Sequence, residues 1–228
     1  MNDTKGFTLV EVLVAVAISL ILLGAVYAAV NSVQRSSAGI EKKVTAQQDV
    51  RPSLELMAME IRMASYNSNF TENIWLDISN CFSVAANQSY RGIQEATASS
   101  ITVEMDIDES GEVGDHNNEI IRYAYDAANQ YITRSTNCAG GAQPFLGDRA
   151  DSGRPRTVRV INDASMPVFR YFDGSGNVIA ALPAGIPDIR TIEITLAVET
   201  AEVDPNTGNP RTMIYSTTII PRNHAPLP

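Results

Sequence analysis

An uninterrupted apolar run near the amino terminus limits what this chain can fold into. Residues 7–30 are apolar except for Thr8, Glu11 and Ser19. As a helix, 24 residues would span about 36 Å, enough to cross a hydrocarbon core of about 30 Å. Glu11 is the unusual member, because an unpaired acid inside a membrane costs at least about 2.5 kcal/mol. The run predicts a transmembrane helix whose carboxylate needs a partner.

Two simpler interpretations explain the run less well. A secretory signal peptide could be cut after the small residue Ala28, but such signals have apolar cores of only about 7–15 residues and a basic leader. Here the run is longer, and the leader balances Lys5 against Asp3. A plain single-pass anchor would leave Glu11 unexplained. No basic residue lies within the run, so the nearest cation would be a new amino terminus at Phe7, created by cleavage after Gly6.

The stretch KGFTLVE, followed by about twenty apolar residues, closely resembles the class III signal of type IV pilins and type II secretion pseudopilins. The resemblance implies that a prepilin peptidase cuts after Gly6 and methylates Phe7. It also implies that Glu11 pairs with the terminal ammonium of a neighbouring pilin in a fibre. Residues 1–6 would then be a cytoplasmic leader, and the chain a single-pass inner-membrane protein before it joins a pilus at the cell surface.

Beyond residue 30 the pattern becomes amphipathic, which predicts that residues 31–66 continue the helix and pack on a head. Pro52 removes a backbone donor, so we expect a kink near it or a short break over residues 49–51. The segment QDVRPSLELMAMEIRMASY also resembles W-type minor pilins and J-type pseudopilins, as does the ending around Arg222 and Asn223.

After residue 66 the apolar period changes to two. Strands are expected in a head of residues 67–228, periplasmic or extracellular, with hairpins at DGSGN and DPNTGNP. The predicted strand regions are residues 101–107, 121–125, 131–133, 157–161, 168–172, 178–182, 192–198 and 211–220. A long helix followed by these strands predicts an α+β fold, with antiparallel sheet packed on the helix.

Composition argues against several other functions. The formal charge of −9 does not suit a surface that neutralises phosphate, so no nucleic-acid partner is expected. The two histidines, His116 and His224, lie in an acidic turn and a proline-flanked tail, away from any recognisable nucleophile motif. We therefore expect a protein that is not an enzyme.

An acidic segment offers oxygen donors at alternate positions, as calcium loops do. The residues expected to form a structural calcium site are Asp106, Asp108, Ser110, Glu112, Asp115 and Glu119. The segment departs from an EF-hand, because its twelfth position is Asn117 rather than an acid. Calcium tolerates varied oxygen geometry. The alternative is a solvated acidic hairpin.

Cys81 and Cys138 are the only cysteines. Outside the cytoplasm a pair of cysteines usually forms a disulfide, and closing this loop would stabilise the head by about 4 kcal/mol. The alternative is two separate buried thiols.

Together these features predict a minor pilin that primes or caps a type IV pilus. The alternatives are a J-type pseudopilin of a type II secretion system and a membrane-anchored adhesive module ordered by calcium.

Overall fold

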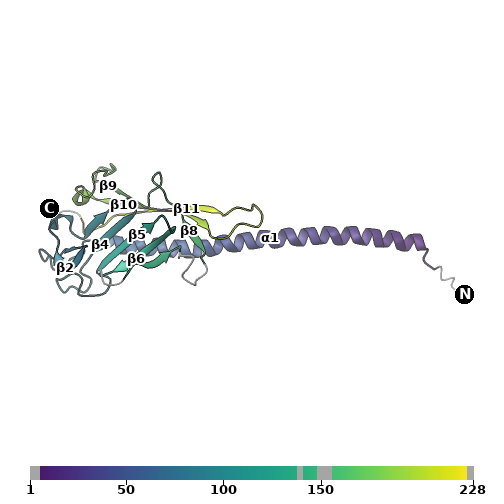
Figure 1. The fold of residues 1–228 in the computed structure, drawn as a ribbon, viewed down its shortest axis with the longest axis horizontal. Coiled ribbons are helices and arrows are strands. Elements are labelled where there is room, and N and C mark those ends of the chain that lie inside the picture. Colours follow the sequence, from purple (N-terminus) through teal and green to yellow (C-terminus); the bar gives the residue numbers. More distant parts are fainter. Residues whose placement is uncertain (1–5, 138–140, 148–155, 225–228) are drawn as a thin grey trace.

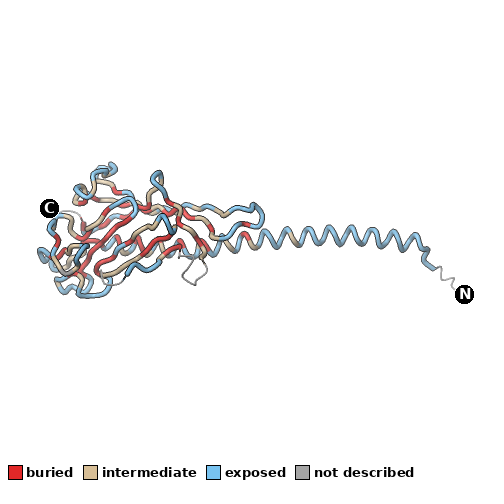
Figure 2. Tube along the Cα trace, in the orientation of Figure 1, coloured by how far each residue is buried: buried red, intermediate tan, exposed pale blue. Residues whose placement is uncertain are grey.

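One helix dominates the shape of the molecule. The computed structural model describes residues 6–137, 141–147 and 156–224. Helix α1 (Leu9–Arg62) runs for 54 residues. Its first half projects from the head, and its second half packs along it (Figure 1). The exposed and buried halves are distinct in Figure 2. The buried residues of α1 all lie in the second half, at Gly39, Ala46, Val50, Leu54, Met57, Ala58 and Ile61.

The helix is continuous through Pro52, so the break expected over residues 49–51 is wrong. Val50 and Leu54 are buried on either side of the proline, which is itself exposed. Packing on both sides explains why the helix continues there, although proline cannot donate a hydrogen bond to the carbonyl four residues earlier. A bend at Pro52 stays a prediction.

The described part of the head contains antiparallel strands in three sheets, and several of these strands are labelled in Figure 1. A five-stranded sheet has the order β3 (Ile93–Ala96), β4 (Ser100–Glu104), β5 (Ile120–Asp126), β6 (Tyr131–Thr136) and β7 (Gln143–Leu146). A four-stranded sheet is built around β10 (Thr191–Thr200), which pairs with β11 (Thr212–Ile219), β8 (Val158–Val160) and β9 (Phe169–Phe172). A small third sheet joins β1 (Leu76–Asp77) to β2 (Asn80–Val84), and two 3₁₀ helices, η1 (Gln88–Tyr90) and η2 (Ile186–Asp188), connect the strands.

The helix and the two larger sheets share one hydrophobic core. Met57 and Ile61 of α1 are fully buried, as are Ile101 of β4 and Leu196 of β10. Burying a large aliphatic side chain contributes about 1.5–3 kcal/mol, so this shared core explains why the second half of α1 is attached to the head. The predicted α+β fold, a long helix packed with antiparallel sheet, is confirmed.

Two predicted strands differ from the structure. The strand expected over residues 101–107 ends at Glu104, because the Asp106 amide turns away and donates to the carbonyl of Tyr66 at 2.9 Å. Residues 178–182 form only one bridge, between Val178 and Phe172. Pro183 follows and has no N–H to extend a ladder, and the chain turns there into η2.

Candidate functional site

The amino-terminal segment places Glu11 at the start of α1. Thr8 is the N-cap: its backbone N and its Oγ1 both donate to Glu11 Oε2, at 2.8 and 2.9 Å, while the Glu11 amide donates to Thr8 Oγ1 at 3.2 Å. This reciprocal arrangement is a capping box. Its T-x-x-E pattern is visible in the sequence, and the capping role was missed there. The Thr8 donors are neutral, so within the described chain the cap satisfies hydrogen bonds without neutralising the carboxylate.

Gly6 and Phe7 lie in an exposed segment without regular secondary structure, just before this cap. Phe7 is 88% exposed, and a Cβ added to Gly6 would meet no atom within 4 Å. The fold therefore does not require glycine at position 6. A peptidase that cuts after a small residue would require one there. Residues 1–5 of the predicted leader lie outside the described residues.

The first half of α1 has the length and composition of a membrane span. One stretch of this half is apolar enough to cross a membrane, and none of that stretch is buried against the head. The Ser19 hydroxyl donates to the carbonyl of Ala15 at 2.8 Å, so this polar group is satisfied within the helix. Glu11 carries a charge in the predicted span, and that charge has no cationic partner in the described chain.

The acidic loop, residues 105–119, joins β4 to β5. Ligand oxygens of Asp106, Asp108 and Glu119 lie within 4.8 Å of one another. Asp106 and Glu119 are fully buried, whereas Asp108 is exposed. The carboxylate of Glu119 accepts backbone hydrogen bonds from Ile107, Gly114 and His116, and burial nevertheless raises its pKa. The backbone amide of Ser110 holds the pKa of Asp108 below its usual value.

The structure brings together three of the six predicted calcium ligands. Ser110 and Glu112 bond to each other instead: the Glu112 amide donates to Ser110 Oγ at 3.2 Å. Asp115 is exposed and lies outside the cluster of three carboxylates. The six-residue set is therefore larger than the cluster that forms, and the binding of calcium stays a prediction.

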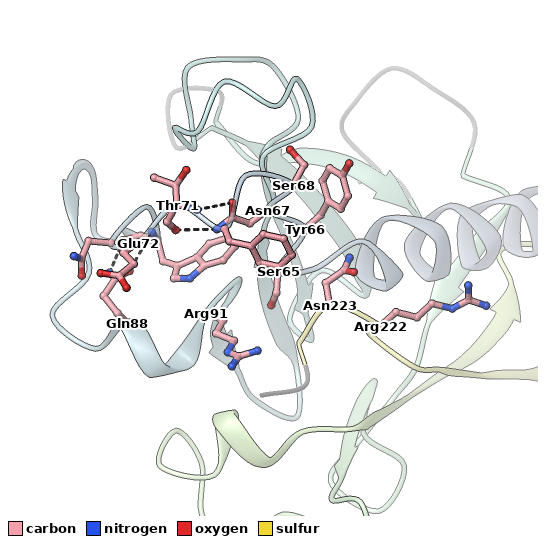
Figure 3. A pocket seen from close by; sticks show the side chains of 13 residues that line it. Ser65, Tyr66, Asn67, Ser68, Thr71, Glu72, Gln88, Arg91, Arg222 and Asn223 are labelled. Atoms are coloured by element: carbon pink, nitrogen blue, oxygen red, sulfur yellow. Dashed lines mark hydrogen bonds between the residues drawn. The ribbon is translucent and has the colours of Figure 1, made fainter. Parts of the chain in front are cut away.

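A groove opens where the chain leaves α1, at the end of the head away from the exposed helical half. Its volume is about 700 Å³. Figure 3 shows Tyr66, Asn67 and Thr71 at this groove, together with Arg91 and Arg222 from distant parts of the chain. Asn67 and Thr71 hydrogen-bond to each other through backbone and side-chain atoms. Periodicity could not reveal this groove, because its residues lie in irregular segments.

A buried serine and a buried histidine contact each other beside this groove, at the same end of the head. Ser65 Oγ lies 2.9 Å from His224 Nδ1, and His224 Nε2 lies 2.8 Å from the carbonyl oxygen of Ile186. The Gly92 amide also donates to Ser65 Oγ at 3.0 Å. Ser65 and His224 are 5% and 1% exposed, so the pair joins the end of α1 to the end of the described chain. Burial lowers the pKa of His224 to about 4.

The predicted disulfide can be followed at one end only. Cys81 lies in β2, half-buried, and is not a free cysteine. Cys138 lies outside the described residues. The pairing of Cys81 with Cys138 stays a prediction.

Comparison with known families bears on the amino-terminal segment. A family model described as the prokaryotic N-terminal methylation motif matches residues 1–27. This match supports a type IV pilin-like protein, a subunit of a pilus or pseudopilus, whose family is structural. It implies processing by a prepilin peptidase and assembly with other pilins, and together with α1 it is consistent with membrane anchoring. No curated protein and no solved structure matches the chain.

Proposed function

We propose that this chain is a minor pilin, which is inserted in the inner membrane by α1, cut after Gly6 and assembled with other pilins near the tip of a type IV pilus. The observation that carries the proposal is the methylation motif, which lies at the start of a helix whose apolar first half is not covered by the head. A helix whose apolar side chains are exposed all round needs lipid or other helices around it. The head packs only on the second half of α1 and leaves the first half free to contact lipid or the helices of other subunits.

Glu11 supplies the assembly contact in this proposal. Its carboxylate has local donors in Thr8 but lacks a cationic partner within the described chain. Cleavage after Gly6 would create an ammonium on Phe7, and a neighbouring subunit would bring a second such ammonium when apolar helices pack together. An ion pair formed in that low-dielectric environment would favour one register of packing.

The experiment complements a deletion strain with variants of Glu11, counts surface pili by electron microscopy and assays secreted protein in the same cultures. Glu11→Gln is the informative variant because glutamine also forms a capping box, so it removes the charge and keeps the cap. Glu41→Gln, on an exposed part of α1 beyond the predicted span, is the matched control.

The minor-pilin proposal predicts loss of pili with secretion intact for the deletion and for Glu11→Gln, and normal pili for Glu41→Gln. Loss of secretion with normal pili would instead support a J-type pseudopilin, which shares the same amino-terminal motif. Incorporation of Glu11→Gln into fibres at the wild-type level would contradict the proposed ion pair. A chain that works from the membrane without entering any fibre would support the anchored adhesive module.

A further inference from the structure

A buried carboxylate oxygen in the acidic loop has no partner. The side chain of Asp106 is fully buried, and while its Oδ2 accepts a hydrogen bond from the Gly111 amide at 3.0 Å, its Oδ1 is buried without a partner. Leaving such an oxygen unsatisfied is costly, and the cost is larger for a charged group. Because the ligand oxygens of Asp108 and Glu119 lie within 4.8 Å, the environment of Asp106 is more negative still.

The described chain does not neutralise this concentration of charge. Among the described residues, none of the three carboxylates forms an ion pair with lysine or arginine. Backbone amides donate to Glu119 and Asp108 and thereby order the loop, but they bring no positive charge. A cation bound between them would stabilise these three carboxylates and would give the buried Asp106 Oδ1 a partner.

The spacing permits Ca²⁺, and the ligand chemistry favours a hard cation of this kind. Oxygens that share a Ca²⁺ ion at roughly 2.3–2.6 Å can lie up to about 5 Å apart, so three oxygens within 4.8 Å of one another can all reach one ion. Carboxylates are hard ligands suited to Ca²⁺ rather than to softer metals. The exposure of Asp108 leaves room for water to complete the shell. We propose that Asp106, Asp108 and Glu119 bind one Ca²⁺ ion in the head.

An ion at this position would also support the groove at the end of the head. The acidic loop is joined to the segment after α1 by the Tyr66 hydroxyl, which donates to Glu109 Oε1 at 2.9 Å, and by the side-chain Nδ2 of Asn69, which donates to the Glu109 carbonyl at 2.7 Å. Tyr66 lines the groove. Calcium would therefore order both the loop and one wall of the groove. This inference does not depend on the proposed role in a fibre.

The test is calorimetric titration of CaCl₂ into the full-length chain, solubilised in a non-ionic detergent and freed of metal by a chelator. We expect one Ca²⁺ per chain, a higher melting temperature in its presence, and weaker binding of Mg²⁺, which prefers shorter bonds and strict octahedral geometry. Asp108→Asn should weaken Ca²⁺ binding by about tenfold or more. Because Asp108 is exposed, this variant should fold, whereas Asp106→Asn changes a fully buried side chain.

Glu112→Gln is the matched control, since it removes a charge from the same loop but outside the cluster. It should bind Ca²⁺ within about twofold of the wild-type affinity. The proposal is overturned if the wild-type chain shows neither heat of binding nor a change in melting temperature, or if Asp108→Asn binds as tightly as wild type. Binding of Mg²⁺ as tight as that of Ca²⁺ would overturn the assignment to calcium.

Discussion

Acidification should destabilise the head through His224. Its imidazole contacts Ser65 and Ile186 in a buried site, and burial lowers its pKa from 6.5 to about 4. The unfolded chain therefore takes up a proton at a higher pH than the folded chain does. Stability from this group is present above pH 6.5 and is lost as the pH falls towards 4. At about 1.4 kcal/mol per pH unit, the loss over this interval is about 3 kcal/mol.

The measurement is a difference between wild type and His224→Gln, because other groups titrate in the same range. Burial raises the pKa of Glu104 to about 8, so its contribution has the opposite sign and would obscure a profile of the wild type alone. Urea unfolding of the full chain in detergent can be followed by the fluorescence of Trp75, the only tryptophan and a buried one. The advantage of wild type over the variant should shrink by about 3 kcal/mol from pH 7 to pH 4.

The same comparison at higher pH provides the control. Above about pH 7.5 the imidazole of His224 is neutral in both the folded and the unfolded chain, so the difference between wild type and His224→Gln should stay constant there. If that difference also stays constant from pH 7 down to pH 4, the reasoning about the buried imidazole is wrong.

Three further predictions concern the head. Gly92→Ala should prevent stable folding, because a Cβ there would lie 2.2 Å from a backbone carbonyl oxygen, whereas Gly174→Ala meets nothing closer than 3.6 Å and should fold normally; equal melting temperatures for the two variants would contradict this. Arg134→Ala should lower the free energy of unfolding by about 2 kcal/mol in urea titrations. The Arg134 guanidinium makes two hydrogen bonds, at 2.7 and 3.1 Å, to the largely buried carboxylate of Glu60 in α1. Mass spectrometry after alkylation of the unreduced, denatured protein should show no modified cysteine if Cys81 and Cys138 are bonded, and two modified cysteines would refute the disulfide.

The sequence predicted the parts of the fold that depend on regular patterns. The long apolar run is continuous, and the amphipathic continuation and the alternating strand later seen as β10 each repeat a period over many residues; all three are present. Strands β1, β2, β3 and β7 were missed because they have only two to five residues and little alternation. The expected break near Pro52 was wrong because packing of Val50 and Leu54 outweighs a local preference.

The candidate sites divide in the same way. The cleavage motif is contiguous, so its resemblance to a known signal can be recognised in the sequence, and the family match covers it. The acidic loop is also contiguous, yet only three of its six predicted calcium ligands lie close together. The Glu119 carboxylate accepts hydrogen bonds from backbone amides, whereas Ser110 and Glu112 hydrogen-bond to each other. The contact between Ser65 and His224 joins residues 159 positions apart. No local pattern in the sequence encodes such a contact.

The most direct test of the account is mass spectrometry of the chain recovered from sheared surface fibres and from membranes. We expect the chain in both fractions, with an amino-terminal peptide that begins at Phe7 and carries one methyl group on its nitrogen. A chain confined to the membrane with residues 1–6 still attached, or one cut after Ala28 as a secretory signal peptide would be, would contradict the account.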